Sequence, residues 1–281
     1  MSLLSPDALY VALAPEHVAL LHVRGGLRPR VLARESVAVD AASTTGAAEN
    51  WRATLEAMRH AIDGKPLRGA RTHVVLANGF ARYRLVPWRS GLRDREEKQA
   101  LVRHGFARVH GERVERWALR WSEGGASEPA VACAIDQGLL AGIEAVAADA
   151  GLRLLSVQPY LVTAFNAWRK QLRENTAWLV LPERTRVCVA LFENGVWRHV
   201  AVRALSGRLD EALPVLLDQE AFAAQLPGLA APVYVHAPAA MVPGPRAEDE
   251  PVHALTVADA ARFGAARHRA HALSLFGGDD A

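Results

Sequence analysis

LYVALAPEHVALLHV, residues Leu9–Val23, places one apolar run on each side of Pro15-Glu16. Short apolar runs with a proline between them predict two strands joined by a tight turn. A second hairpin is predicted within Trp178–Leu205, where Asn194-Gly195 is a typical hairpin turn. Because further strands and helices follow each hairpin, we expect two lobes, each of which begins with a strand hairpin.

The segment after the first hairpin predicts a helix and then two strands. The helix presents one apolar face, formed by Trp51, Leu55, Met58 and Ile62. Strands at Thr72–Asn78 and Phe80–Trp88 are expected to pair through an Asn78-Gly79 turn. Arg82 and Arg84 share one parity of the second strand, which places them on a predicted solvent face.

A charged helix is predicted at Arg93–His110, with its buried stripe at Gln99, Val102, Phe106 and Val109. Trp117–Trp121 and Ala130–Ile135 read as strands, and a final alanine-rich helix is predicted at Asp259–Leu275. This succession predicts an α/β protein with mixed sheets.

The composition predicts a packed soluble protein. The chain has 281 residues, of which 51% are hydrophobic and 22% charged, enough for one large or two small domains. Its two cysteines, Cys133 and Cys188, exclude a disulfide framework and fit a reducing cytoplasm. No stretch has the length and continuity of a membrane-spanning helix.

The net charge of +3 and the isoelectric point near 9.1 suggest nucleic-acid binding, but the pattern argues against it. Lysine and arginine outnumber aspartate and glutamate 24 to 18 in residues 1–175, whereas residues 176–281 hold 9 against 12. Because no dense basic cluster appears in the sequence, we expect no nucleic-acid partner.

This order of elements resembles the PilM family of type IV pilus assembly proteins, and is similar to the cytoplasmic domain of GspL in type II secretion and to MshI-type proteins. The closest match is Thr72–Trp168. There, Arg82-Tyr83-Arg84-Leu85-Val86-Pro87 stands where the family ends a strand pair, and Ala150-Gly151-Leu152 closes a helix. Ser156-Val157-Gln158-Pro159 leads into an apolar helix, and Cys188–Arg203 resembles the family's second phosphate hairpin.

The resemblance implies an actin-like (ribonuclease H-like) two-lobed α/β architecture with mixed sheets and a shortened second lobe. The first lobe would span residues 1–175 and include a small inserted subdomain at about residues 89–150. The second would span residues 176–281.

The sequence departs from the family at its nucleotide contacts. Actin-like ATPases hold phosphate and magnesium on two hairpins, each with an Asp-x-Gly core. Here the turns read Ala14-Pro15-Glu16 and Pro182-Glu183-Arg184, without that core, and Ala237-Pro238 stands where the family carries a Gly-Gly. We therefore expect a degenerate member, a pseudo-ATPase without cofactor.

No catalytic or metal-binding pattern appears in the sequence. Gly-x-Ser-x-Gly, Gly-x-Gly-x-x-Gly and phosphate-loop motifs are absent. His268 and His271 form a His-x-x-His pair, but no nearby acid or cysteine completes a ligand set, so an exposed basic helix end is the better interpretation. We expect no enzyme activity and no metal.

By resemblance, PilM binds the short cytoplasmic N-terminus of the membrane protein PilN in a groove of the first lobe. The apolar part of such a groove is predicted to comprise Tyr83, Leu85, Trp88, Val102 and Phe106. Arg84 and Arg103 would stand at its rim. The alternative for each residue is packing against the lobe's own helix.

The expected function is therefore a cytoplasmic, non-catalytic scaffold of a pilus or secretion assembly. It would bind a PilN-like inner-membrane partner without inserting into the membrane, and self-association stays open. A divergent actin-like ATPase that still binds ATP and magnesium is the competing hypothesis. An unrelated two-lobed α/β protein is a third.

Overall fold

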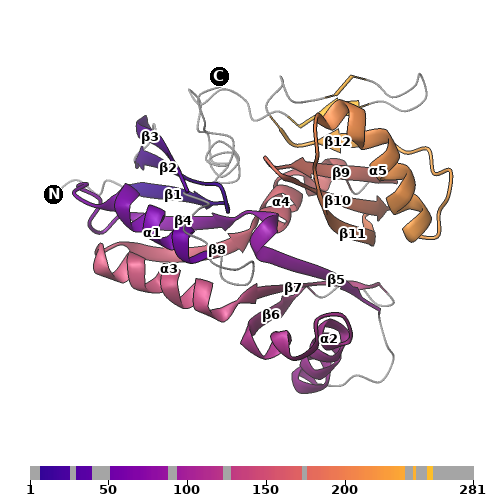
Figure 1. Cartoon of the computed structure of the whole chain (residues 1–281), viewed down its shortest axis with the longest axis horizontal. Coiled ribbons are helices and arrows are strands. Elements are labelled where there is room, and N and C mark those ends of the chain that lie inside the picture. The colour runs from indigo at the N-terminus through magenta and orange to yellow at the C-terminus, as the bar shows by residue number, and fades with distance from the viewer. Residues whose placement is uncertain are drawn as a thin grey trace. The chain divides into compact units, whose positions relative to one another are not determined.

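Figure 1 shows the computed structural model, which describes residues 7–25, 30–39, 51–87, 94–122, 128–172, 176–237, 243–244 and 252–255. The chain forms two compact units, residues 1–80 with 138–167 and 257–281, and residues 81–137 with 168–256. The helix expected at Asp259–Leu275 lies outside the described residues. The lobe boundary expected at residue 175 stays a prediction.

The first unit is built on a five-stranded sheet in the order β3-β2-β1-β4-β8. Its strands are β1 (Ala8–Leu13), β2 (His17–Arg24), β3 (Arg30–Ala38), β4 (Arg71–Leu76) and β8 (Arg153–Pro159). β1 pairs antiparallel with β2, as the opening sequence predicts, and parallel with β4. β1, β2 and β4 are rich in buried aliphatic residues and form the core of the sheet, whereas the residues of the edge strands β3 and β8 are partly or fully exposed.

Helices α1 (Trp51–Ile62) and α3 (Gln137–Asp149) belong to this unit, and α4 (Tyr160–Leu172) begins in it. α1 buries Leu55, Met58 and Ile62, three of the four residues in its predicted stripe. The two helices approach each other closely, because a Cβ on Gly142 would lie 2.1 Å from Leu55 Cδ1. Glycine thus permits this helix contact.

The second unit contains a five-stranded sheet in the order β11-β10-β9-β12-β13. Its strands are β9 (Ala177–Pro182), β10 (Arg186–Glu193), β11 (Val196–Ala204), β12 (Val233–Val235) and β13 (Val252–Ala254). The two five-stranded sheets share one topology. In each, the first three strands along the chain pair antiparallel, the fourth pairs parallel with the first, and the fifth pairs parallel with the fourth. Each sheet therefore begins with an antiparallel hairpin, as the sequence predicts.

A three-stranded sheet in the order β5-β7-β6 also belongs to the second unit. It consists of β5 (Ala81–Val86), β6 (Trp117–Trp121) and β7 (Ala130–Asp136), and α2 (Arg95–His110) packs against it (Figure 1). Asp94 caps α2, since its Oδ1 accepts a hydrogen bond from the Glu97 amide at 2.8 Å. Gly111 ends the helix at a φ of 61°.

The predicted hairpin at Asn78-Gly79 is wrong. β4 pairs with β1 and β8, whereas β5 pairs with β7, so the two strands belong to different sheets. Asn78–Phe80 forms a short 3₁₀ helix instead. The buried Asn78 Oδ1 accepts a hydrogen bond from the Leu161 amide at 3.1 Å, in the first turn of α4. This long-range contact outweighs the local turn preference.

The predicted stripe of α2 is half correct. Val102 and Phe106 are buried, but Gln99 is exposed and Val109 is 65% exposed. The helix buries an i, i+4 row, and the next residue of that row, His110, stacks on Phe106 with ring centroids 6.3 Å apart. A row at that spacing leaves Val109 on the solvent side.

A buried ionic cluster joins β11 to α5 (Leu209–Ala223). Glu220, which is 2% exposed, accepts hydrogen bonds from His199 Nε2 at 2.6 Å and from Arg203 Nε at 2.6 Å. Burial alone raises the pKa of Glu220, but His199 and Arg203 outweigh it and hold that pKa below its ordinary value. The carboxylate is therefore stabilised in its charged form.

Replacing Glu220 with alanine is expected to lower the free energy of unfolding by about 2 kcal/mol at neutral pH, because charge-assisted hydrogen bonds are lost. Since the native pKa is depressed, this contribution is present above the unfolded pKa and is lost as the pH falls through the native value. Urea titrations at pH 7 and in acid measure both effects. Glu211→Ala, an exposed change on the same helix, is the control. An equal loss in both variants contradicts the cluster's role.

Candidate partner-binding site

The candidate site is centred on β5, whose two faces differ. Val86 belongs to the core beneath α2, and Arg84 lies along that helix, because a Cβ on Gly105 would be 2.9 Å from Arg84 Nε. Alternation along the strand places Tyr83 and Leu85 on the opposite face. Both are only partly buried. β5 therefore carries an apolar face and a face that contacts α2.

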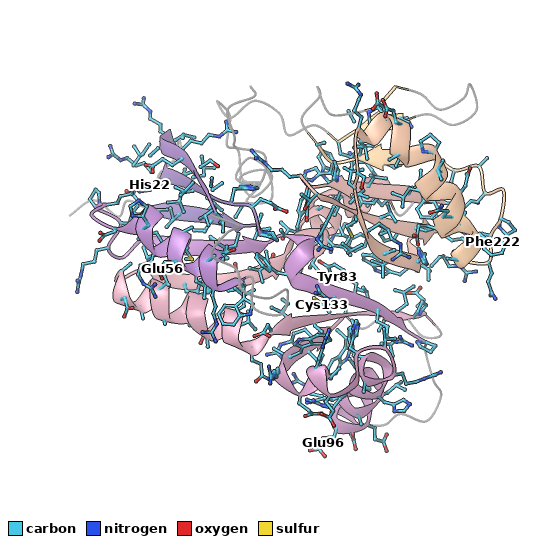
Figure 2. All side chains as sticks on the ribbon, viewed as in Figure 1. His22, Glu56, Tyr83, Glu96, Cys133 and Phe222 are labelled. Carbon is cyan, nitrogen blue, oxygen red and sulfur yellow. The ribbon has the colours of Figure 1, made fainter. Side chains whose placement is uncertain are left out.

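Pairing with β7 holds these residues in register. Tyr83 stands opposite Cys133, and Leu85 stands opposite Val131, in an antiparallel ladder. Figure 2 labels Tyr83 and Cys133 close together in this sheet. Cys133 and Val131 are buried, so their neighbours on β5 supply the more accessible apolar surface.

Val102 and Phe106, two further residues of the predicted site, lie inside the core beneath the sheet. Each is 1% exposed. They pack with Val86, Val114, Leu119, Ala132 and Ala134. The Phe106 ring also meets Trp117 edge-on, with centroids 6.3 Å apart. In this arrangement, Val102 and Phe106 support the strand and present almost no surface to a partner.

The remaining predicted residues differ in their setting. Arg84 and Arg103 are partly buried, and Arg103 Nη1 donates a hydrogen bond to Glu115 Oε2 at 3.2 Å. Trp88 lies outside the described residues. The structure therefore groups Tyr83, Arg84 and Leu85 on one strand, with Arg103 on the adjacent helix.

Sequence reasoning missed two arginines near β5. Arg113 follows α2 in a 3₁₀ helix whose Val114 enters the same core as Val86. Arg186 begins β10 and pairs with Ala204 at the end of β11, and β11 lies beside β5. No local signal could have placed Arg186 there, because about a hundred residues separate it from β5.

The two cysteines are poor nucleophiles. Burial raises the pKa of Cys133 to about 12 and raises the pKa of Cys188 well above its ordinary value. A thiol that stays protonated at neutral pH neither attacks a carbonyl nor binds a metal readily. These residues fit small apolar positions in their strands.

The turns of the β1–β2 and β9–β10 hairpins are closed by their own backbone. The Ala14 amide donates to the His17 carbonyl at 2.9 Å, and the Glu183 amide donates to the Arg186 carbonyl at 2.7 Å. Pro15 carries no amide hydrogen, and Glu16 and Glu183 add carboxylates to the two turns. Both features disfavour a bound phosphate, which needs free amides and a positive field.

Among the residues that the structure describes, no group of three or more histidine, cysteine, aspartate or glutamate side chains is arranged to hold a metal ion. His268 and His271 lie outside this part of the chain. No described helix is long and apolar enough to cross a membrane.

Comparison with known proteins gives matches at the level of structure. No protein-family model and no curated protein sequence matches the chain. The complex named "PilM-PilN type IV pilus biogenesis complex" is similar over 95% of this chain and 97% of its own, with 18% identity and a TM-score of 0.55.

Two further structures cover 82% of this chain. The cytoplasmic domain of EpsL, an inner-membrane component of the Vibrio cholerae type II secretion system, is 15% identical with a TM-score of 0.54 over 81% of its chain. A Bacteroides thetaiotaomicron protein with an actin-like ATPase fold and unknown function is 10% identical with a TM-score of 0.55 over 82% of its chain.

These likenesses, together with two sheets of the same strand order, establish the fold. The expected α/β actin-like architecture is confirmed: the chain has the actin-like ATPase fold.

Proposed function

We propose that this protein is a non-catalytic scaffold that binds the cytoplasmic segment of an inner-membrane partner in a pilus or secretion-type assembly. The observation that carries the proposal is that Tyr83 and Leu85, two apolar residues on one face of β5, keep part of their surface exposed, while α2 supports the strand from its other side. Recognition of an extended segment needs such an apolar surface together with polar groups that set its register.

The fold is a second, independent support for the proposal. The chain has the same fold as the EpsL cytoplasmic domain, named as part of an inner-membrane component, and as the structure named a PilM-PilN complex. A PilN-like protein is accordingly the proposed partner class, and this protein acts in the cytoplasm, peripheral to the membrane. Turnover is not part of the proposal, because both hairpin turns have carboxylates and lack an Asp-x-Gly core.

The test is a peptide titration. A labelled peptide is made from the cytoplasmic segment of a protein encoded beside this gene, chosen because that segment precedes a single membrane helix. We expect saturable binding by fluorescence anisotropy. Leu85→Ala should weaken it about tenfold, since roughly 1–2 kcal/mol of apolar contact is lost.

Leu32→Ala is the matched control, because Leu32 is also a strand leucine and is 40% exposed on β3. It should leave the affinity unchanged. Circular dichroism establishes that both variants are folded. Absence of binding to every such segment, or equal losses in the two leucine variants, would falsify the proposed function.

A further inference from the structure

Exposed aliphatic and arginine side chains lie together at the end of the β2–β3 hairpin. Val31 is 37% exposed and its neighbour Leu32 is 40% exposed, both on β3. Arg24, the last residue of β2, and Arg30 and Arg34 on β3 are exposed as well. We refer to these five residues as the hairpin end. β3 is the outer strand of the first unit's sheet, so the hairpin end lies at an edge of that sheet (Figure 1).

The strand register places two of these arginines against each other. Arg24 stands directly opposite Arg30 in the antiparallel ladder of β2 and β3. Like charges on directly opposed residues repel each other and weaken the pairing of the two strands. The folding of this hairpin therefore gives no reason for an arginine at both positions.

Two acids flank the hairpin end, and each already contacts a basic side chain. Asp7 Oδ2 lies 3.3 Å from His22 Nε2, and Glu35 forms an ion pair with Lys65. The three arginines thus leave an excess of positive charge at this end of the hairpin. A surface with concentrated negative charge complements it.

A β-bulge accounts for the exposure of two successive aliphatic residues. Val31 pairs with Val23, and Ala33 pairs with His22, so Leu32 is an extra residue in the ladder. In a regular strand, successive side chains point to opposite faces, whereas a bulge bends the strand and redirects a side chain. The bulge therefore adds Leu32 to the exposed surface beside the arginines.

Protection of the sheet edge explains only part of this pattern. Charged side chains and bulges both discourage an edge strand from pairing with another chain. Exposed Val31 and Leu32 have the opposite effect, because aliphatic side chains at an edge favour association. Arginines beside exposed aliphatic residues are typical of segments that bind the interface of an anionic membrane.

We propose that the hairpin end binds the surface of a membrane that contains anionic lipids. Arg24, Arg30 and Arg34 contact the phosphate groups, while Val31 and Leu32 reach the boundary between headgroups and acyl chains. A nucleic acid would supply phosphates without that apolar layer, so lipid is the better match. The inference goes beyond the proposed function, which concerns a partner segment at β5 in the second unit.

The expected strength is that of a supporting contact. One arginine close to an anionic surface strengthens binding roughly fivefold, so three arginines give a preference on the order of 100-fold over a neutral membrane. Such a contact is weak by itself. It becomes effective when a membrane partner holds the protein near the surface, because the second contact then forms at high effective concentration.

The experiment is co-sedimentation of the full-length protein with vesicles. One set is pure phosphatidylcholine, and the other contains about 30% phosphatidylglycerol, which supplies the anionic charge. At about 50 mM NaCl, binding to the anionic vesicles should be at least about thirtyfold tighter. That preference should shrink at about 500 mM NaCl, because salt screens exposed charges.

The combined variant Arg24→Gln and Arg30→Gln should weaken binding to the anionic vesicles about twentyfold. Its unfolding midpoint should stay equal or rise, because the repulsion across the ladder is removed, so loss of the fold cannot explain the loss of binding. Leu32→Ser should weaken binding about threefold, since one aliphatic side chain fewer leaves water. Arg108→Gln with Arg120→Gln is the matched control: it removes the same charge from exposed positions of the second unit and should leave binding unchanged.

Three outcomes overturn the inference. Equal binding to the two kinds of vesicle removes the lipid contact. Equal losses in the two double arginine variants reduce the effect to net charge. Binding of double-stranded DNA that needs Arg24 and Arg30, without a preference for anionic vesicles, assigns the hairpin end to nucleic acid. Each of these outcomes leaves the proposed function standing, because the peptide titration with Leu85→Ala tests it separately.

Discussion

Phe106→Ala is expected to lower the free energy of unfolding by about 4 kcal/mol, because deleting a buried aromatic ring removes transfer energy and leaves a cavity. Phe106 is 1% exposed at the centre of the core between α2 and the three-stranded sheet. Its ring contacts Trp117 and His110, which lie at the edge of that core.

Urea denaturation followed by tryptophan fluorescence measures this loss, since Trp117 lies beside the deleted ring. Val109→Ala is the control on the same helix: Val109 is 65% exposed, and such surface changes stay within about 0.5 kcal/mol. A loss below about 1 kcal/mol for Phe106→Ala contradicts the proposed packing. Peptide binding should fall with stability, because β5 loses the helix that supports it.

Acid is expected to destabilise the protein by about 3 kcal/mol between pH 6.5 and pH 4 through His236 alone. Burial lowers the pKa of this histidine to about 4, so its native form is neutral over that range. Its ring lies in the core beside Trp168, with centroids 6.1 Å apart, and its amide donates to the Val180 carbonyl at 3.0 Å.

The direction of this pH effect on stability follows from proton binding in the two states. The unfolded chain binds a proton at His236 below its ordinary pKa of 6.5, whereas the native state does so only near 4. Stability is thus complete above pH 6.5 and is lost as the pH falls toward 4. Urea titrations across this range should show a shallower pH slope for His236→Phe. His60→Gln, an exposed change, should keep the slope. Parallel slopes for His236→Phe and the unchanged protein contradict the buried neutral ring.

The elements that sequence predicts well are those governed by local pattern. Leu9–Val23 alternates around a proline, so the first hairpin follows from residues adjacent in the chain. Asn78 shows the limit of such reasoning. Asn-Gly is a strong hairpin signal, but here the asparagine side chain bonds to an amide 83 residues away. A contact between residues so far apart in the chain cannot be predicted from the local sequence pattern.

In the candidate site, too, some features follow from the local sequence and others depend on long-range contacts. The β5 residues Tyr83, Arg84 and Leu85 could be selected from strand parity and resemblance. The packing on the α2 side of β5 could not, because Val102, Phe106 and Val114 meet Val86 only when α2 has folded against the sheet. The burial of Phe106 and the exposure of Val109 likewise depend on which helical row meets the sheet.

The most direct test of the scaffold proposal is a thermal denaturation of the full-length protein with and without about 5 mM Mg-ATP, because a ligand that binds only the folded state must raise its stability. The proposed loss of the nucleotide site predicts an unchanged unfolding midpoint. A rise of several degrees would contradict it and would identify the turns at Ala14-Pro15-Glu16 and Pro182-Glu183-Arg184 as parts of an unusual phosphate site.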